Sequence, residues 1–289
     1  MTLAQNSPQP RLADPARLAQ ARARARLDLA GFLHDEAKAE LQERLIDVNR
    51  RFTAPALVTA FPDYWADLAP GARMVAPDEV LDLTPGTHDL VIHAMALHWA
   101  DDPVGQIVQC RRALRPDGLF LSAAFGGETL VELRTALAQA ETEVLGGLSP
   151  RVAPMAEIRD MGGLLQRAGL ALPVADRLPK TVTYPDAFAL MADLRAMGET
   201  NALADRHRKP APRALFARMA AIYAANFPAA DDEKRIRASF EIVFLSGWAP
   251  HDSQQKPLRP GAAKARLADA LGTSAFDETA RPVLHPSDD

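Results

Sequence analysis

The chain has 289 residues, of which 48% are hydrophobic and 24% charged, and this balance excludes a wholly disordered, collagen-like or coiled-coil protein. Lysine and arginine (33) against aspartate and glutamate (37) leave a net charge of -4, which argues against a dedicated nucleic-acid binder. The single cysteine, Cys110, excludes an intramolecular disulfide and a multi-cysteine metal site. We therefore expect a globular protein of a reducing compartment.

Both ends of the chain have the composition of tails. Residues 1–20 are rich in proline, glutamine and asparagine, and residues 273–289 in proline, aspartate and serine. Such segments bury too little apolar surface to offset the entropy of ordering. The start of the chain holds no signal-peptide pattern, and the most apolar run, residues 90–100, is too short to cross a bilayer. We expect disordered tails at 1–20 and 273–289, one domain over 21–272, no membrane span and a cytoplasmic location.

The domain begins with an amphipathic pattern from Arg22 to Val48, which predicts one long N-terminal helix. Its basic start, Arg22, Arg24 and Arg26, has the composition of a solvated face, with contact to nucleic acid or acidic lipid as the minor alternative. After this helix, short apolar runs alternate with helical patterns, which is typical of a mostly parallel sheet covered by helices.

The apolar runs predict strands at residues 54–59, 72–75, 89–95, 119–125, 239–245 and either 170–174 or 180–184. Helices are predicted from Pro103, over 128–145, from 155 to 169, from Pro185 and over 212–227. We interpret the part from about 185 to 230 as a helical insertion that caps the domain. Ligands of such sheets bind beyond the carboxyl ends of the strands, so residues 96–102 and 126–129 are the loops of interest.

Several catalytic classes have no support in the sequence. The seven histidines form no i, i+4 pair and no cluster with acids at metal-ligand spacing, so we predict no metal site. The sequence also lacks a Gly-x-Ser-x-Gly elbow and a phosphate-binding loop. Hydrolase and nucleotidase functions are therefore disfavoured.

The chain from Asp89 onward resembles the second half of a class I S-adenosylmethionine (SAM) dependent methyltransferase. Residues 88–91 enter the fourth strand of that fold, residues 96–99 follow it, and residues 114–120 lead into the fifth. The resemblance implies an α/β protein with a Rossmann-like, mostly parallel sheet, an N-terminal helix and a helical cap.

Further segments resemble the mitochondrial complex I assembly factor 5 family and its bacterial relatives. These segments are residues 125–130, 132–134, 140–143, 146–150, 163–169, 184–185, 193–201, 247–248 and 251–254. The resemblance covers roughly residues 22–260. A more distant resemblance is to the malonyl carrier-protein methyltransferase of biotin synthesis, which shares the segments around the fourth and fifth strands.

The resemblance implies SAM as cofactor and a protein client, such as a respiratory complex I subunit, that the chain modifies or chaperones. Mitochondrial members are associated with arginine hydroxylation, and most bacterial ones with methyl transfer. Two functions stay open: a SAM-dependent methyltransferase or related enzyme, and a non-catalytic scaffold or assembly factor, a pseudoenzyme that has lost SAM binding. A different small ligand is a third interpretation. The oligomeric state is not predicted, and no residue is assigned a catalytic role.

The chain departs from the family at the first strand, whose glycine-rich turn lets the backbone approach the cofactor. No glycine occurs from residue 32 to residue 70, and the interval to the fourth strand is about one αβ unit short, so the acid that holds the ribose is missing as well. Phe61, Tyr64 and Trp65 stand where the glycines are expected. We place these rings in the pocket, where they fill the space of SAM or stack on its adenine.

Four residues are assigned to the cofactor by the resemblance. Asp78 matches the acid after the third strand that faces the adenine amino group, with a solvated loop acid as the alternative. Leu97, His98 and Trp99 match the loop that lines the pocket after the fourth strand. For His98 and Trp99, structural packing is an equal alternative.

The remaining candidates are substrate or pocket residues. Phe125, Gly126, Gly127 and Glu128 follow the fifth strand, where two glycines allow close approach of a ligand. The alternative for Glu128 is a capping charge at a helix start. Arg134 and Glu141 are expected to face solvent. Near the C-terminus, Trp248 and His251 belong to a polar loop suited to client recognition or closure of the pocket.

Overall fold

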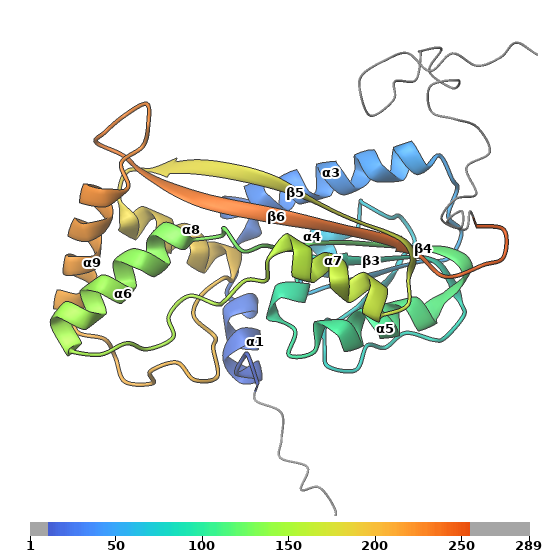
Figure 1. The fold of residues 1–289 in the computed structure, drawn as a ribbon, viewed down its shortest axis with the longest axis horizontal. Helices are drawn as coiled ribbons and strands as arrows, with labels where there is room; N and C mark the ends of the chain where they lie inside the picture. Colours follow the sequence, from blue (N-terminus) through green and yellow to red (C-terminus); the bar gives the residue numbers. More distant parts are fainter. Residues whose placement is uncertain (1–10, 255–289) are drawn as a thin grey trace, which may run out of the picture. The chain divides into compact units, whose positions relative to one another are not determined.

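The computed structural model describes residues 11–254 (Figure 1). Its folded unit ends at His251. The predicted tail at 273–289 and the predicted C-terminal end of the domain lie outside the described residues.

The strands are β1 (Pro55–Thr59), β2 (Arg73–Val75), β3 (His88–Ala94), β4 (Leu114–Phe125), β5 (Ala171–Tyr184) and β6 (Ile236–Trp248). The helices are α1 (Pro15–Ala23), α2 (Leu27–Ala30), α3 (Phe32–Val48), α4 (Pro62–Trp65), α5 (Pro103–Ala113), α6 (Val131–Leu145), α7 (Ile158–Arg167), α8 (Ala187–Met197) and α9 (Arg213–Asn226), with a 3₁₀ turn η1 (Leu97–Trp99).

The described strands form a six-stranded sheet in the order β2-β1-β3-β4-β6-β5. Strands β1 to β4 are parallel, and β6 runs antiparallel to both β4 and β5. The predicted α/β fold with a mostly parallel sheet is therefore confirmed. Both alternatives for the strand after residue 169 belong to β5, because β5 pairs with β6 from Ala171 to Tyr184.

The two faces of the sheet are buried by different helices. In β1, Ala56 and Val58 belong to the core formed with α5 and α7, whereas Leu57 packs into the core that includes α3. Alternate residues of a strand point to opposite faces, so this pattern follows directly from the pleat. A fully apolar run such as Leu90 to Ile92 is needed because both faces are covered.

The N-terminal region differs from the single predicted helix. Asp14 accepts a hydrogen bond from the Arg17 N–H and caps α1, and the chain leaves the helix after Ala23. Leu18 of α1 packs near Trp99, whereas α3 buries its apolar stripe against the sheet. A single straight helix cannot pack both against Trp99 and against the sheet. Helix α1 also occupies part of the segment predicted as a tail, because its cap and Leu18 stabilise it.

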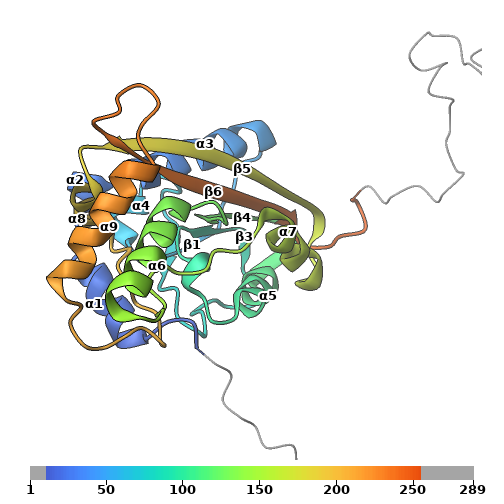
Figure 2. The same cartoon turned by 60° about the vertical axis from the view of Figure 1, so that its left-hand side comes forward.

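A helical cap extends the sheet at one end. Strands β5 and β6 run past β4, and α8 and α9, which lie between them in sequence, pack there with each other (Figure 1). Helix α6 packs along α9 and completes the group (Figure 2).

Candidate functional site

A first cavity of about 520 Å³ lies at the carboxyl ends of β1, β2 and β3. Its lining residues are Arg11, Ala13, Pro15, Leu18, Ala19, Arg22, Thr59, Ala60, Pro62, Met74, Val75, Ala76, Pro77, Asp78, Glu79, Trp99, Ala100, Asp101, Asp102 and Gln106. Loops after three parallel strands thus meet the N-terminal segment and α1. The volume is in the range of small-molecule sites, and the position is the one that open α/β sheets use for ligands.

A second cavity of about 320 Å³ lies between the end of β4 and the cap. Its lining residues are Arg17, Trp99, Phe125, Thr129, Leu130, Leu133, Leu137, Arg151, Val152, Ala153, Met155, Met191, Leu194, Arg195, Glu199, Thr200, Asn201, Phe216 and Phe240. Trp99 lines both cavities, so its indole stands at their junction.

The junction is held by a buried carboxylate that sequence reasoning missed. Glu199 Oε2 accepts a hydrogen bond from Trp99 Nε1 at 2.7 Å, and Oε1 accepts one from His98 Nε2 at 3.3 Å. The side chain of Glu199 is 10% exposed. Burial raises the pKa of Glu199, but His98, Trp99 and the more distant Arg22 outweigh burial and hold the pKa below its usual value. Glu199 is therefore an anion.

Glu199 is placed by the end of α8. Gly198, with φ +83°, ends the helix in the left-handed conformation that glycine adopts readily. Its N–H donates to the Arg195 carbonyl, and the Glu199 N–H donates to the Leu194 carbonyl. The sequence signal is the acid directly after a helix-ending glycine. Its role could not be predicted, because its partners lie about 100 positions earlier in the chain.

The turn after β1 has few free backbone donors. The Phe61 N–H donates to Thr59 Oγ1 at 3.2 Å, and Pro62 has no N–H to offer. In the glycine-free turn, two of the first three residues after β1 therefore offer no free amide. Thr59, Ala60 and Pro62 form the cavity wall at this point.

The structure does not place the aromatic residues of this region in the first cavity. Trp65 is fully buried, and its indole N–H donates to His34 Nδ1 at 3.2 Å. The Tyr64 hydroxyl hydrogen-bonds with Asp35, and Phe61 packs edge-on to the His34 ring. The helical turn of α4 directs these rings toward α3. Phe61, Tyr64 and Trp65 therefore line neither described cavity, contrary to the expectation that they are pocket residues.

Of the four predicted cofactor residues, Asp78 and Trp99 line the first cavity. Leu97 is part of the buried core, and His98 lies behind the lining, where it supports Glu199. The loop of Asp78 is fixed by Gln106, whose side-chain amide donates to the Asp78 carbonyl at 3.0 Å. The strand before Asp78 is β2. The resemblance matched it to a third strand, but in the structure it pairs directly with β1.

The predicted pocket residues after β4 lie in different environments. Phe125 lines the second cavity. Gly126 packs against Glu241, where an added Cβ would approach Glu241 Oε1 to 2.4 Å, and Gly127 lies beside Glu157. Glu128 is exposed. The two glycines therefore accommodate protein side chains, and neither they nor Glu128 line the described cavities.

The predicted C-terminal pocket residues lie at the wrong end of the sheet. Trp248 pairs with Leu119, near the beginning of the paired part of β4, whereas both cavities lie at the carboxyl ends of the parallel strands. His251 follows shortly after and is exposed. Because β6 is antiparallel to β4, its last residues return to the amino end of β4. The predicted proximity of Trp248 and His251 to the pocket is therefore wrong.

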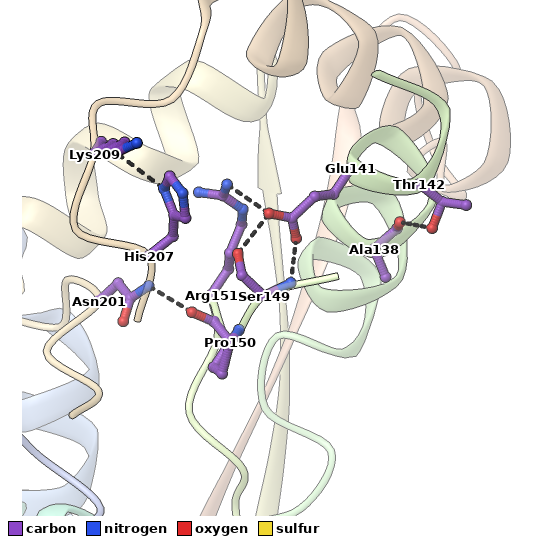
Figure 3. A network of polar contacts seen from close by, with 9 residues as sticks. All are labelled: Ala138, Glu141, Thr142, Ser149, Pro150, Arg151, Asn201, His207 and Lys209. Carbon is purple, nitrogen blue, oxygen red and sulfur yellow. Dashed lines mark hydrogen bonds and ion pairs between the residues drawn. The ribbon is translucent and has the colours of Figure 1, made fainter. Parts of the chain in front are cut away.

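The wall of the second cavity is fixed by Glu141, which was expected to face solvent (Figure 3). Its buried carboxylate accepts hydrogen bonds from the Ser149 N–H, the Ser149 hydroxyl and Arg151 Nη2 at 2.9, 2.5 and 2.7 Å. Burial raises the pKa of Glu141, but Arg151 and Ser149 outweigh it and lower the pKa. Asn201 also donates to the Pro150 carbonyl, which joins this segment to the loop after α8.

Neither a metal cluster nor a membrane-spanning helix occurs in the part of the chain that the structure describes. Residues 11–254 hold no group of three or more histidine, cysteine, aspartate or glutamate side chains placed for a metal ion. No helix in this range has the length and apolar character to span a membrane.

Comparison with known proteins gives matches to the folded part of the chain. Residues 33–122 match the family described as a methyltransferase domain. The mitochondrial arginine-hydroxylase NDUFAF5 of Dictyostelium discoideum is 40% identical over 199 residues, which cover 69% of this chain and 45% of the relative. The human protein of the same name is 37% identical over 194 residues, 67% of this chain and 55% of the relative.

A second group of relatives carries another activity in its name. The malonyl-[acyl-carrier protein] O-methyltransferase of Xylella fastidiosa is 35% identical over 181 residues, 63% of this chain and 58% of the relative. The chain spans about half the length of the curated relatives it matches. From these matches and the sheet topology, the chain has the Rossmann-like α/β fold of class I SAM-dependent methyltransferases and is similar in sequence to the NDUFAF5 arginine hydroxylases.

Proposed function

We propose that the chain binds SAM in the first cavity and modifies a side chain of a protein client in the second. The observation that carries this proposal is the junction of the two cavities at Trp99, with the buried anion Glu199 beside it. A cofactor and a client side chain can meet only where their sites adjoin, because group transfer requires the reacting atoms to be within contact distance.

The first cavity has groups that suit a nucleoside cofactor. Asp78 and Glu79 follow β2, about 20 residues after the turn of β1, where an acid binds ribose hydroxyls in related α/β folds. Met74 and Val75 add apolar wall for a base. When bound, SAM would supply an electrophilic methyl group on its sulfonium. The acids of this cavity also favour that positive charge.

The second cavity suits an arginine side chain, the group named in the activity of the NDUFAF5 relatives. Its walls are mostly apolar and suit the alkyl part of the side chain. The Glu199 carboxylate has no lysine or arginine ion pair among the described residues, and a guanidinium can bind a carboxylate with two hydrogen bonds. His98 and Trp99 act as positioning residues for Glu199.

We infer that the client is a protein and that a respiratory complex I subunit is the first to test, since the family resemblance implies it. We also propose a cytoplasmic location, which the single cysteine and its complete burial support.

A non-catalytic scaffold is the second candidate, and the turn after β1 favours it. The Phe61 amide is already bound by Thr59, and Pro62 has none, so this turn cannot cradle a cofactor as a glycine turn does. Isothermal titration with SAM and S-adenosylhomocysteine, together with thermal shift, separates the candidates. A ligand that binds the folded state raises its apparent stability. Micromolar binding supports the enzyme, whereas no binding at millimolar ligand supports the scaffold.

The side-chain specificity is tested with client peptides that contain arginine and with matched peptides in which lysine or glutamine replaces it. We expect retention of the arginine peptide by wild type, loss of retention by Glu199→Gln, and no loss by Glu128→Gln, whose parent residue is exposed. Mass spectrometry of the incubated peptide distinguishes an added methyl group from an added oxygen. Equal retention of all peptides would contradict the assignment of Glu199.

A further inference from the structure

The first cavity contains an arginine without a partner. Arg22, on α1, lines the cavity and is half-buried. Its guanidinium makes no ion pair or hydrogen bond with any residue in the range 11–254. Burial lowers the pKa of Arg22, against the opposing effects of Glu199 and Asp78. A guanidinium stays charged in proteins, so a half-buried positive charge, with hydrogen-bond donors unpaired among residues 11–254, faces this cavity.

Arg22 lies near the turn in which Phe61 and Pro62 offer no free amide. A Cβ built on Gly198 would come within 3.5 Å of both the Arg22 Cα and the Phe61 ring, which places the two residues on either side of this glycine. Thr59, Ala60 and Pro62 of the same turn line the cavity together with Arg22. The guanidinium donors of Arg22, which have no partner among residues 11–254, thus lie on the same cavity as the two turn residues that offer no free amide.

Because the cavity lining is rich in acids, an anionic group of a ligand can bind there only beside a cation such as Arg22. Four acids line the described cavity, Asp78, Glu79, Asp101 and Asp102. Asp101 accepts hydrogen bonds from the N–H groups of residues 12 and 13, and Asp102 caps α5. A carboxylate that enters among these acids is repelled unless a cation contacts it directly. Arg11, the other arginine of the lining, is exposed.

We infer that Arg22 is the carboxylate receptor of this cavity and that it replaces the glycine turn in binding the amino-acid part of the cofactor. This inference rests on the proposed binding of SAM. It makes α1 part of the cofactor site, so the site is complete only when the N-terminal segment is packed over the sheet. A planar guanidinium can bind the carboxylate with two parallel hydrogen bonds, which one lysine ammonium cannot match.

Two ligands separate the carboxylate from the rest of the cofactor. S-adenosylhomocysteine carries the amino-acid carboxylate, and 5′-methylthioadenosine has the same adenosine and sulfur without it. By isothermal titration, we expect Arg22→Ala to lower the affinity for S-adenosylhomocysteine roughly 10- to 100-fold, which corresponds to the loss of a charge-assisted hydrogen bond. Binding of 5′-methylthioadenosine should change by less than about twofold. The affinity of Arg22→Lys for S-adenosylhomocysteine should lie between those of wild type and Arg22→Ala.

The matched control is Arg24→Ala, which removes an exposed arginine at the end of α1 that does not line the cavity and should leave both affinities unchanged. Thermal unfolding without ligand verifies that each variant is folded. Equal weakening of both ligands by Arg22→Ala would overturn the inference, because Arg22 would then only support the cavity wall. Unchanged binding of both would overturn it as well. If wild type binds neither ligand, the proposed function fails together with the inference, and this result is distinct from the other two.

Discussion

The two cavities meet at Trp99 but are built by different parts of the molecule. The first is formed by loops at the ends of parallel strands and is covered by α1, and its lining holds four acids and two arginines. The second is formed mainly by α6, α8 and the loops near them, and its lining is mostly apolar around Glu199.

The sheet and the helical cap thus each form one of the two cavities. The sheet provides a polar cavity at the position that its topology dictates, because parallel strands end at one edge, and this is the cavity that we propose for the cofactor. The helical cap and the loop after α8 provide the mostly apolar cavity that we propose for the client side chain. Changes in the supports of one cavity should therefore affect that cavity more than the other, except at the residues that touch both.

The largest expected effect concerns two buried histidines, His34 and His93. His93 hydrogen-bonds through Nε2 with Gln106 of the cavity lining at 2.8 Å, and His34 packs with Phe61. Burial lowers the pKa of each to about 4. The unfolded chain takes up protons near pH 6.5, and the folded chain only near pH 4. The free energy of unfolding should thus fall over this window by up to about 3 kcal/mol per histidine.

Urea unfolding between neutral pH and pH 4.5 or so measures this loss of stability. His93→Gln should flatten the pH profile by about half, because it removes one of the two titrating groups. His207→Gln, at an exposed position, should leave the profile unchanged. A profile that does not depend on pH in wild type would show that these histidines are hydrated in the folded state.

The second prediction tests the support of the client site. Glu199→Ala removes the acceptor of His98 Nε2 and Trp99 Nε1 and leaves two buried donors unsatisfied. We expect a loss of about 3 kcal/mol in the free energy of unfolding. Glu199→Gln, which keeps one acceptor, should lose less. Chemical denaturation measures both, with Glu128→Ala as a surface control that stays within about 0.5 kcal/mol of wild type.

The third prediction concerns Gly198, which lies beside Arg22 of the first cavity and directly precedes Glu199 of the second. Gly198→Ala puts a side chain at φ +83° and brings its Cβ to 3.3 Å from the Ala25 Cβ. We expect a cost of about 1–2 kcal/mol in thermal unfolding. Gly163→Ala, inside α7 with open space around it, should stabilise the protein by about 0.5–1 kcal/mol. Similar losses for both variants would mean that the left-handed conformation of residue 198 is not maintained.

The smallest expected effect concerns the attachment of α1. Arg206 Nη2 pairs with Asp14 Oδ2 at 2.9 Å and links the loop after α8 to the cap of α1. Arg206→Ala should lower the affinity for S-adenosylhomocysteine by up to about fivefold, because a partly exposed ion pair contributes little to the stability of the α1 attachment. The neighbouring Arg208→Ala, without such a pair among the described residues, serves as control. An effect as large as that of Arg22→Ala would mean that α1 detaches entirely.

The sequence by itself determined the sheet and the helices on it, since these follow from local patterns. Apolar runs gave β1 and β3 within one residue at each end, and Pro103 after the capping Asp102 marked the start of α5. Sequence patterns also indicated which loops to inspect, because a loop after a parallel strand must end at that edge of the sheet. Trp99 and Asp78 line the first cavity at this edge, and their assignment to a cofactor stays a prediction.

Only the tertiary structure decided which polar groups face each other. Trp248 lies away from the cavities because β6 runs antiparallel, a direction that local sequence does not encode. Arg22 has the composition of a solvated helix face, and it becomes a cavity residue only because α1 turns over the strand ends. Glu199 gains its function from His98 and Trp99, which are distant in sequence. Long-range juxtaposition of this kind depends on packing of the whole domain, and no local pattern reports it.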